Sequence, residues 1–298
     1  MGQAVYSKGS WRPWVKIESD LGLWRADGAL EVLEAQYGAL FHFDEHFERL
    51  VKSCSGYKDL DMSQLPSESE VREHVEHLLK KESSNAIVHI LVTPGTSADL
   101  KNTDGFPEMV IDVRRLENSS DAPPLKLITK NVRRYFPEFK LTAGYGYARR
   151  FQAEAAGEGY DNFLYWGERT GILEGPYENF FVVTKTGCLY TPASNVLKGV
   201  TRKIFLELAK KSDIFTEVCE VPWAIHLGYL ERCSEAFLSS TTKGGIPAKE
   251  SGDISQIRQI DGYDHFEVGA DTRSAELKRL FLEYRENYFA SRRKKTET

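Results

Sequence analysis

The 298-residue sequence has few cysteines, no long apolar run and no excess of positive charge. Its four cysteines, Cys54, Cys188, Cys219 and Cys233, include no CxxC pair, and a chain of this length does not depend on disulfides, so we expect reduced thiols. No apolar stretch approaches the roughly 18 residues of a membrane span. The formal net charge of −5 gives no general attraction to nucleic acid or anionic lipid. We therefore expect neither a membrane nor a nucleic-acid partner.

The N-terminal segment MGQAVYSKGSW shows no targeting signal. It has no apolar signal core, and the myristoylation pattern fails because Tyr6 stands where serine or threonine is required. We expect a cytoplasmic protein. Apolar residues make up 41% of the chain and aromatic residues 12%, which is typical of a globular protein able to bury a large core in one or two domains.

Residues 1–119 mix strand-like runs with amphipathic helices, which predicts an α+β domain. The polar segment ENSSDAPP (117–124) ends in two prolines and predicts a linker to a second domain, residues 120–298. Strands are predicted at 85–95, at 109–116 and in a hairpin at 28–43 turning at Tyr37 and Gly38. Helices are predicted in DEHFERLVKSC, with Asp44 as N-cap, and in SESEVREHVEHLLKKES. In the second part, LKLITKNV, NFLYWG, FFVVTKTG and CLYTP predict strands, and TRKIFLELAKKS predicts a helix opened by Thr201.

One lysine stands in an unusual setting. In FKLTAGYGYARRFQAEA (139–155), Lys140 precedes a run of small residues and then a segment with helical periodicity. A lysine amine attacks a carbonyl when desolvation or a nearby positive charge removes its proton near neutral pH. Small neighbours would leave space for a flat cofactor. The alternative is an ordinary solvated or ion-paired lysine.

Three further segments contain polar residues beside glycine. ILEGPYENFFVV (172–183) places acidic residues around a tight turn, and its alternative reading is a hairpin whose carboxylates face water. In NVLKGVTRKIFLELAK (195–210), Gly199 allows a turn into a helix whose N-terminus can bind phosphate, although most such helices bind nothing. EAFLSSTTKGGIP (235–247) has four hydroxyl residues that more often form a solvated turn.

The order and spacing of these segments resemble the fold-type IV pyridoxal-phosphate enzymes, the class-IV aminotransferase family. The family includes branched-chain and D-amino-acid aminotransferases, (R)-amine transaminases and aminodeoxychorismate lyase. The resemblance runs from about Gly22 to about Pro247, and FDEHFERL, the lysine segment, EGPYENF, LKGVTR and SSTT match its motifs in order. It implies a two-domain α+β fold, with a small α/β sandwich domain and a larger β-barrel-like domain, and it implies a homodimer.

The resemblance also implies the cofactor pyridoxal 5′-phosphate and assigns residues to it. Lys140 would form the internal aldimine, Tyr145 would bind the phenolic oxygen, and Glu174 would face the pyridine nitrogen. A carboxylate there keeps the ring able to accept electrons. Arg49 would pair with the phosphate, supported by Glu178. The remaining contacts would come from the backbone of Val200 and Thr201, the hydroxyls of Ser240 and Thr241, and the side chain of Leu197 against the ring. No metal is predicted.

The implied reaction is ping-pong transamination between an amino acid or primary amine and a 2-keto acid. Lys140 would move a proton between Cα and C4′ of the cofactor. The alternatives are a lyase of the aminodeoxychorismate lyase type and a non-catalytic or nucleic-acid-binding protein on the same fold. The lyase branch uses a threonine on the first hairpin strand, but residues 27–34 contain none. The presence of Lys140 and Glu174 argues against a non-catalytic protein.

The usual substrate-binding side chains of the family are missing. The segment 94–99 lacks the arginine and histidine of D-amino-acid aminotransferases, and Leu30 replaces their hairpin tyrosine. His89 stands where branched-chain enzymes have an arginine, and Ile87 where they have an aromatic residue. The candidates for binding a substrate carboxylate are Arg25, His89 and Lys243. A buried structural role is the alternative for His89, and the donor, the acceptor and their handedness stay open.

Overall fold

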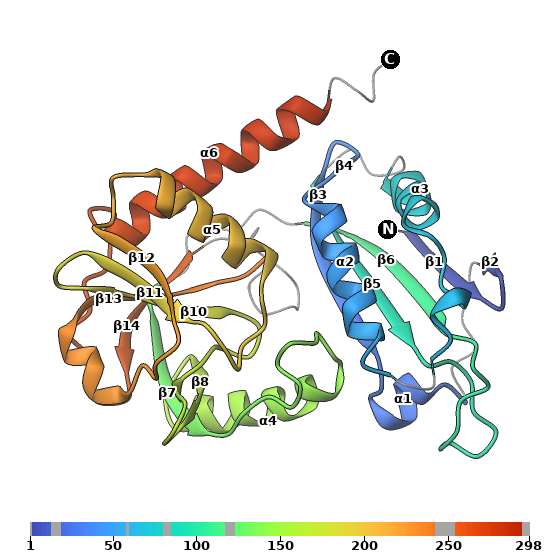
Figure 1. Cartoon of the computed structure of the whole chain (residues 1–298), viewed down its shortest axis with the longest axis horizontal. Helices are drawn as coiled ribbons and strands as arrows, with labels where there is room; N and C mark the ends of the chain where they lie inside the picture. Colours follow the sequence, from blue (N-terminus) through green and yellow to red (C-terminus); the bar gives the residue numbers. More distant parts are fainter. Residues whose placement is uncertain are drawn as a thin grey trace. The chain divides into compact units, whose positions relative to one another are not determined.

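The computed structural model describes residues 2–12, 19–57, 60–79, 85–116, 123–241 and 254–293. The chain divides into two compact units, whose elements are labelled in Figure 1. The first unit contains the described residues up to 116, the segment Phe139–Tyr145 and the described residues from Asn287 onward. The other described residues form the second unit. Lys140 therefore belongs to the first unit. The predicted boundary at residues 119 and 120 lies outside the described residues and stays a prediction.

A six-stranded antiparallel sheet with the order β2-β1-β6-β5-β3-β4 forms the centre of the first unit. The predicted hairpin is confirmed, and its turn residues Tyr37 and Gly38 have φ angles of 50° and 81°. Two positive φ angles match the right-handed twist of the paired strands. The strands are β1 (Gly2–Ser7), β2 (Ser10–Arg12), β3 (Ala29–Gln36), β4 (Ala39–Leu40), β5 (Ala86–Thr93) and β6 (Glu108–Arg115).

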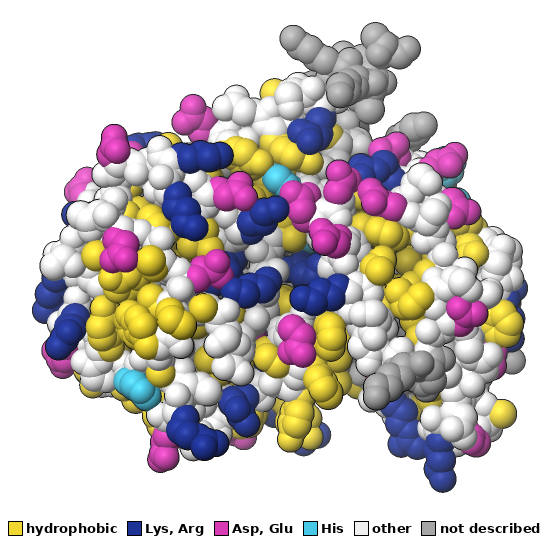
Figure 2. Space-filling model, in the orientation of Figure 1, with side chains coloured by type: hydrophobic (Ala, Val, Ile, Leu, Met, Phe, Trp, Pro, Cys, Tyr) yellow, Lys and Arg dark blue, Asp and Glu magenta, His cyan; other side chains and the backbone are white. Residues whose placement is uncertain are grey.

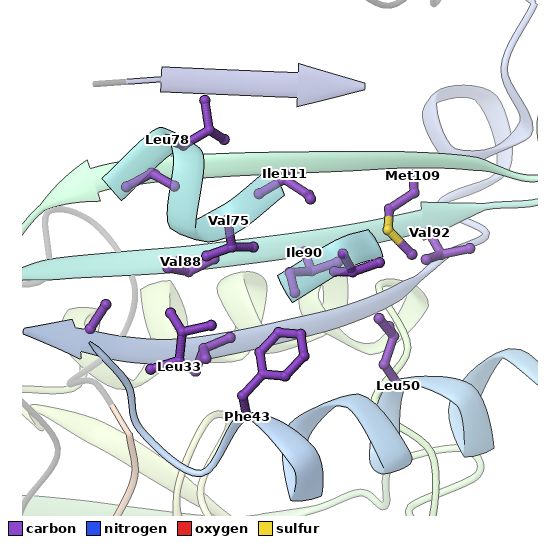
Figure 3. Close-up of a cluster of buried hydrophobic side chains, with 14 of the residues drawn as sticks. Leu33, Phe43, Leu50, Val75, Leu78, Val88, Ile90, Val92, Met109 and Ile111 are labelled. Carbon is purple, nitrogen blue, oxygen red and sulfur yellow. The ribbon is translucent and has the colours of Figure 1, made fainter. Parts of the chain in front are cut away.

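Helices α2 (Phe43–Cys54) and α3 (Glu68–Leu79) pack against this sheet through one apolar cluster. Figure 3 shows Leu50 of α2 and Val75 of α3 among side chains from the central strands. The predicted N-cap Asp44 is wrong by two positions, because α2 begins at Phe43 and His42 occupies its N-cap with a φ of 48°. The unit also contains the short helices α1 (Leu21–Arg25) and η1 (Met62–Gln64).

The second unit is built on an eight-stranded mixed sheet with the order β12-β11-β10-β13-β14-β7-β8-β9. Ile225, four residues beyond edge strand β12, accepts a hydrogen bond of 2.8 Å from the backbone of Ile172 in the opposite edge strand β9. The sheet therefore curls until its edges meet, as the predicted barrel-like domain requires. Its strands are β7 (Leu125–Asn131), β8 (Asn162–Gly167), β9 (Gly171–Ile172), β10 (Asn179–Thr184), β11 (Cys188–Pro192), β12 (Glu217–Val221), β13 (Cys233–Ser239) and β14 (Ile254–Ile260).

The remaining helices are α4 (Ala143–Gly157), α5 (Val200–Lys211), η2 (Leu227–Arg232) and α6 (Arg273–Arg293). Helices α5 and α6 pack together through Phe205 and Phe281, whose ring centroids are 4.6 Å apart. The predicted helix start is close but not exact. Helix α5 begins at Val200 with Gly199 at its N-cap, so Thr201 is already its second residue.

Figure 2 shows lysine and arginine side chains interspersed with aspartate and glutamate side chains over the face that it displays. Among the described residues, no helix is both long enough and apolar enough to cross a membrane. The same residues contain no group of histidine, cysteine, aspartate and glutamate side chains arranged to hold a metal ion. All four cysteines are described and are free thiols.

Candidate active site

The backbone around Lys140 is attached to two elements of the first unit. Leu30, near the start of β3, donates a hydrogen bond of 3.0 Å to the carbonyl of Lys140, and Thr142 donates one of 2.8 Å to the carbonyl of Gly28. The amide of Lys140 donates to Oγ of Ser53 in α2 over 3.0 Å. Bonds on both sides of the peptide fix the direction in which the lysine side chain leaves the backbone.

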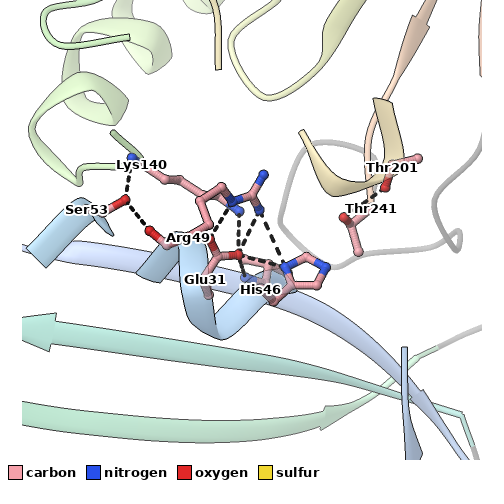
Figure 4. A network of polar contacts seen from close by, with 8 residues as sticks. Glu31, His46, Arg49, Ser53, Lys140, Thr201 and Thr241 are labelled. Atoms are coloured by element: carbon pink, nitrogen blue, oxygen red, sulfur yellow. Dashed lines mark hydrogen bonds and ion pairs between the residues drawn. The ribbon is translucent and has the colours of Figure 1, made fainter. Parts of the chain in front are cut away.

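The side chain of Lys140 ends in a buried cluster around Glu31 (Figure 4). We call Glu31, His46, Arg49 and Lys140 the Glu31 cluster. Helix α2 supplies His46 and Arg49, which are three residues apart and so lie on one side of the helix. Arg49 binds Glu31 with two nitrogens, Nε to Oε1 at 2.6 Å and Nη2 to Oε2 at 2.8 Å. The same Oε2 is 2.8 Å from Nδ1 of His46 and 3.6 Å from Nζ of Lys140.

The Glu31 cluster carries a net positive charge although it is almost closed to solvent. The side chains of Arg49 and Lys140 are 11% and 12% exposed. Burial by itself raises the pKa of Glu31, but the charges of Arg49 and Lys140 outweigh it and hold that pKa well below its usual range. Burial lowers the pKa of His46 to about 4, so His46 is neutral near pH 7 and its Nδ1–H donates to the carboxylate. One negative charge therefore faces two positive ones.

Sequence reasoning missed Glu31. Glu31 pairs with Arg49 within the first unit, and the predicted support of Arg49 by Glu178 stays a prediction. Glu178 belongs to the second unit, where its Oε2 accepts a hydrogen bond of 3.1 Å from the backbone of Tyr177. The available signal was strand alternation, which places Glu31 on the same face of β3 as the buried apolar residues Ala29 and Leu33.

In the second unit, Glu174 lies just after β9 and is 2% exposed. Its Oε1 accepts a hydrogen bond of 3.1 Å from Nη1 of Arg134. Its Oε2 accepts bonds of 3.1 Å from Nδ2 of Asn179 and 3.0 Å from the backbone of Leu197. Burial raises the pKa of Glu174, and Arg134 and the Leu197 bond oppose this shift. Three donors thus hold one buried carboxyl group in place, and sequence reasoning identified neither Arg134 nor the contact made by Asn179.

Hydroxyl groups gather near the start of α5 in the same unit. The Oγ1 atoms of Thr201 and Thr241 are 3.2 Å apart (Figure 4). Val200 and Ser240 are also buried, and Oγ of Ser239 is buried without a hydrogen-bond partner among the described residues. The N-cap residue of α5 is a glycine, so no side chain caps the free N–H groups of the first turn. This arrangement suits an anion.

The proposed substrate-binding residues have varied surroundings. Arg25 ends α1 and donates from Nε to the carbonyl of Leu100 over 2.9 Å. His89 lies on β5, where burial lowers its pKa and Nδ1 has no partner within the described residues. The β3–β5 register places His89 on the same face of the sheet as Leu30 and on the opposite face from Glu31. Lys243 lies outside the described residues.

The structure brings together some of the predicted site residues within each unit. In the first unit, Lys140 and Arg49 share one carboxylate. Tyr145, in the first turn of α4, is only partly buried, and its predicted contact with the cofactor stays a prediction. In the second unit, Leu197 contacts Glu174 through its backbone, and Thr201 contacts Thr241.

Comparison with known proteins identifies the family. Residues 28–251 match the family described as amino-transferase class IV, which is well over half of the chain. A putative branched-chain-amino-acid aminotransferase of Methanocaldococcus jannaschii is 26% identical over 265 residues, covering 81% of this chain and 84% of the relative. A D-alanine aminotransferase of Listeria monocytogenes is 27% identical over 280 residues, covering 90% of each.

Solved structures share the fold. The branched-chain amino acid aminotransferase of Escherichia coli superposes with a TM-score of 0.75 at 22% identity, covering 95% of this chain and 93% of that one. A putative 4-amino-4-deoxychorismate lyase of Legionella pneumophila gives a TM-score of 0.74 at 18% identity, covering 92% and 96%. The predicted family and fold class are confirmed. The chain therefore belongs to the class IV aminotransferases, which are pyridoxal-phosphate enzymes of fold type IV.

Proposed function

We propose that this protein is a transaminase that moves an amino group between an amino acid or primary amine and a 2-keto acid, with Lys140 as its catalytic residue. The observation that carries the proposal is the Glu31 cluster, in which Lys140 and Arg49 lie against one buried carboxylate. Family membership alone leaves the substrates and the reaction type open, because the relatives include both aminotransferases and a lyase.

The residues present fit a cofactor that carries a phosphate. The excess positive charge of the Glu31 cluster favours an anion at Arg49. In the second unit, the start of α5 offers backbone N–H groups, and the buried hydroxyl of Ser239 has no partner among the described residues. We assign Arg49, Val200, Thr201, Ser240 and Thr241 to the phosphate.

The residues also fit a cofactor with a basic ring nitrogen. A carboxylate has about four acceptor positions, and the bonds to Glu174 from Arg134, Asn179 and Leu197 occupy three of them. A positively charged N–H donor would offset the cost of burying this carboxyl group. We therefore assign Glu174 to the ring nitrogen, Leu197 to the ring face and Tyr145 to the ring oxygen.

Pyridoxal phosphate, when bound, supplies an electron sink for the bond that breaks at the substrate Cα. The protein's own task is to hold the reactants and to move a proton. The amine of Lys140 takes the proton from Cα and returns it, and the bonds that its peptide makes with Leu30 and Ser53 restrict where that amine can reach. Arg49 anchors the phosphate, and Glu174 maintains the charge of the ring nitrogen.

One observation favours transamination over lyase chemistry. The lyase branch places a threonine on the first hairpin strand to assist elimination, but the β3 side chain that lies against Lys140 is the carboxylate of Glu31. The side chain of Lys140 is 12% exposed, which supports a lysine held by protein contacts rather than one surrounded by water. An ion-paired structural lysine has the same geometry, so a test of the chemistry at Lys140 is required. The homodimer that the family resemblance implies is part of the same proposal.

A panel of amine donors tests this function. We expect the absorption spectrum of the bound cofactor to change when the purified protein meets at least one D-amino acid, L-amino acid or (R)-phenylethylamine, and to return when a 2-keto acid is added. A lyase would instead release its keto product without any requirement for a keto acid. Lys140→Ala is the control and should give no spectral cycle. No spectral change with any donor would contradict the proposal.

A further inference from the structure

Glu31 is a carboxylate on an otherwise apolar face. On β3 the alternation of side chains places Ala29, Glu31 and Leu33 on the side of the sheet that packs into the apolar cluster, and all three are fully buried. An ionised carboxylate in such a place is stable only with charged or hydrogen-bonded partners. Arg49, His46 and Lys140 are those partners. The carboxylate at position 31 therefore serves to balance the positive charges beside it.

We propose that Glu31 is a positioning residue for Lys140, whose buried carboxylate stabilises the protonated lysine amine and so sets the pH at which that amine gives up its proton. The inference rests on the proposed catalytic role of Lys140. Its geometric basis is the distance of 3.6 Å between Oε2 of Glu31 and Nζ of Lys140, whose side chains are 1% and 12% exposed. Charges are screened least where water is excluded.

Four neighbouring groups would act against protonation of the amine or leave it unchanged, and one of them is His89, whose pKa burial lowers, so that it is neutral near pH 7. Arg49 carries a positive charge that disfavours a second one nearby. His46 is neutral near pH 7, because burial lowers its pKa to about 4. Cys54, on the same helix, is an uncharged thiol at that pH, because burial raises its pKa to about 12. Glu31 supplies the negative charge that lies 3.6 Å from the amine.

This charge matters because transamination needs the lysine amine in both protonation states. The amine must lose its proton to react with a carbonyl, and it must hold the proton taken from Cα until it is returned. With Arg49 alone beside it, the amine would be a weak proton acceptor. Glu31 offsets Arg49, so Lys140 keeps enough basicity to accept the proton from Cα.

The test measures how the reactivity of the Lys140 amine depends on pH. The full-length chain, freed of cofactor, is acetylated with limiting acetic anhydride across a pH series, and labelling of Lys140 is quantified by peptide mass spectrometry. Acetylation requires the unprotonated amine. In Glu31→Gln we expect the pH of half-labelling to fall by about one to two units, the shift typical of losing an opposite charge at this distance.

Glu34→Gln is the matched control. Glu34 is also a buried carboxylate on β3, but alternation places it on the opposite face from Glu31. The control should keep the parent's half-labelling pH, because it makes the same chemical change elsewhere on the strand. If Glu31→Gln and the parent show the same half-labelling pH, the proposed electrostatic role of Glu31 is wrong.

Glu31→Gln could fail to fold, because it leaves Arg49 without a full countercharge. Glu31→Asp keeps the charge, but its shorter side chain places that charge farther from Nζ of Lys140. This variant should therefore also lower the half-labelling pH, by a smaller amount. An unchanged value in Glu31→Asp would then overturn the inference. Acetylation uses neither substrate nor cofactor. A shift in labelling without any spectral cycle in the donor panel would thus refute the transaminase function while leaving the coupling between Glu31 and Lys140 intact.

Discussion

Arg134 donates a hydrogen bond of 3.1 Å from Nη1 to Oε1 of Glu174, and the side chains of the pair are 8% and 3% exposed. Burial raises the pKa of the Glu174 carboxyl, and the arginine opposes that shift. Asn179 and the backbone of Leu197 fix the other oxygen. Hydrogen bonds thus hold both oxygens of Glu174, an arrangement that suits the role we propose for it at a protonated ring nitrogen.

Replacing Glu174 by glutamine should slow proton transfer far more than it weakens cofactor binding. The amide preserves the size of the side chain but removes the charge that we propose keeps the ring nitrogen protonated. We expect single-turnover rates to fall on the order of 10²-fold or more, measured by stopped-flow absorbance with an accepted donor. Glu168→Gln, at an exposed position of the same unit, is the control. A Glu174→Gln enzyme with the parent's rate would refute the role.

Replacing Arg49 should have the opposite effect and chiefly loosen the cofactor. Arg49→Gln removes the charged fork that we assign to the phosphate, a charge-assisted interaction that contributes roughly 1.5–3 kcal/mol. The dissociation constant for pyridoxal phosphate should rise about 10-fold to 100-fold, measured by equilibrium dialysis. Arg72→Gln is the control, because Arg72 pairs with Asp44 and Glu68 near the surface. This variant should leave the dissociation constant for pyridoxal phosphate unchanged. Equal affinities in both variants would contradict the assignment.

The buried His46 should make folding sensitive to mild acid. Burial lowers its pKa to about 4 in the folded chain, against the ordinary 6.5 of a histidine. Between these pH values the unfolded chain binds a proton at His46 and the folded chain does not, so the free energy of unfolding falls as the pH falls. The loss should be about 3 kcal/mol between pH 6.5 and pH 4.

Urea unfolding at pH 7 and pH 4.5 measures this loss. His46→Gln should depend less on pH than the parent, whereas the exposed His77→Gln should behave like the parent. Glu31 adds to the slope only below the ordinary pKa of a glutamate, because there the unfolded chain binds the proton while the folded carboxylate, whose pKa is held well below that value, does not. Identical slopes in the parent and His46→Gln would show that His46 is not held neutral by burial.

Binding of the substrate carboxylate should depend on one of the three candidate side chains. We would compare Arg25→Ala, His89→Ala and Lys243→Ala with D-alanine, L-leucine and (R)-phenylethylamine as donors. Loss of the true contact should raise the KM for accepted amino acids by about one to two orders of magnitude and leave the amine, which has no carboxylate, unaffected. If all three variants match the parent, the carboxylate is bound by backbone groups or by a neighbouring subunit.

The sequence predicted most of the fold because its patterns are local. Alternating apolar residues and the Tyr37-Gly38 turn predict the β3–β4 hairpin. The helical spacing of apolar residues predicts α2, in which Leu50 is buried but Val51 is 37% exposed. The ends of helices were less predictable. His42 occupies the N-cap of α2 in a left-handed conformation, for which propensity gives no signal.

Long-range pairs could not be predicted in the same way. Lys140 is 109 positions from Glu31, and Arg134 is 40 positions from Glu174. No periodicity connects such positions, since their approach depends on how strands are ordered in a sheet. Strand alternation places Glu31 on the inward face of β3, but the sequence reasoning did not use this signal, and the partners of Glu31 required the structure. The family resemblance identified Lys140, Arg49 and Glu174 as candidates, because the motifs of a family mark residues that lie close together in its fold although they are far apart in the sequence.

Identifying the lysine that bears the cofactor tests the central claim most directly. The purified protein is reduced with borohydride, digested and mapped by peptide mass spectrometry. We predict that the pyridoxyl label is found on Lys140, and that Lys140→Ala yields no labelled peptide. A label on another lysine, or no label in protein reconstituted with pyridoxal phosphate, would contradict the assignment of Lys140 as the catalytic residue.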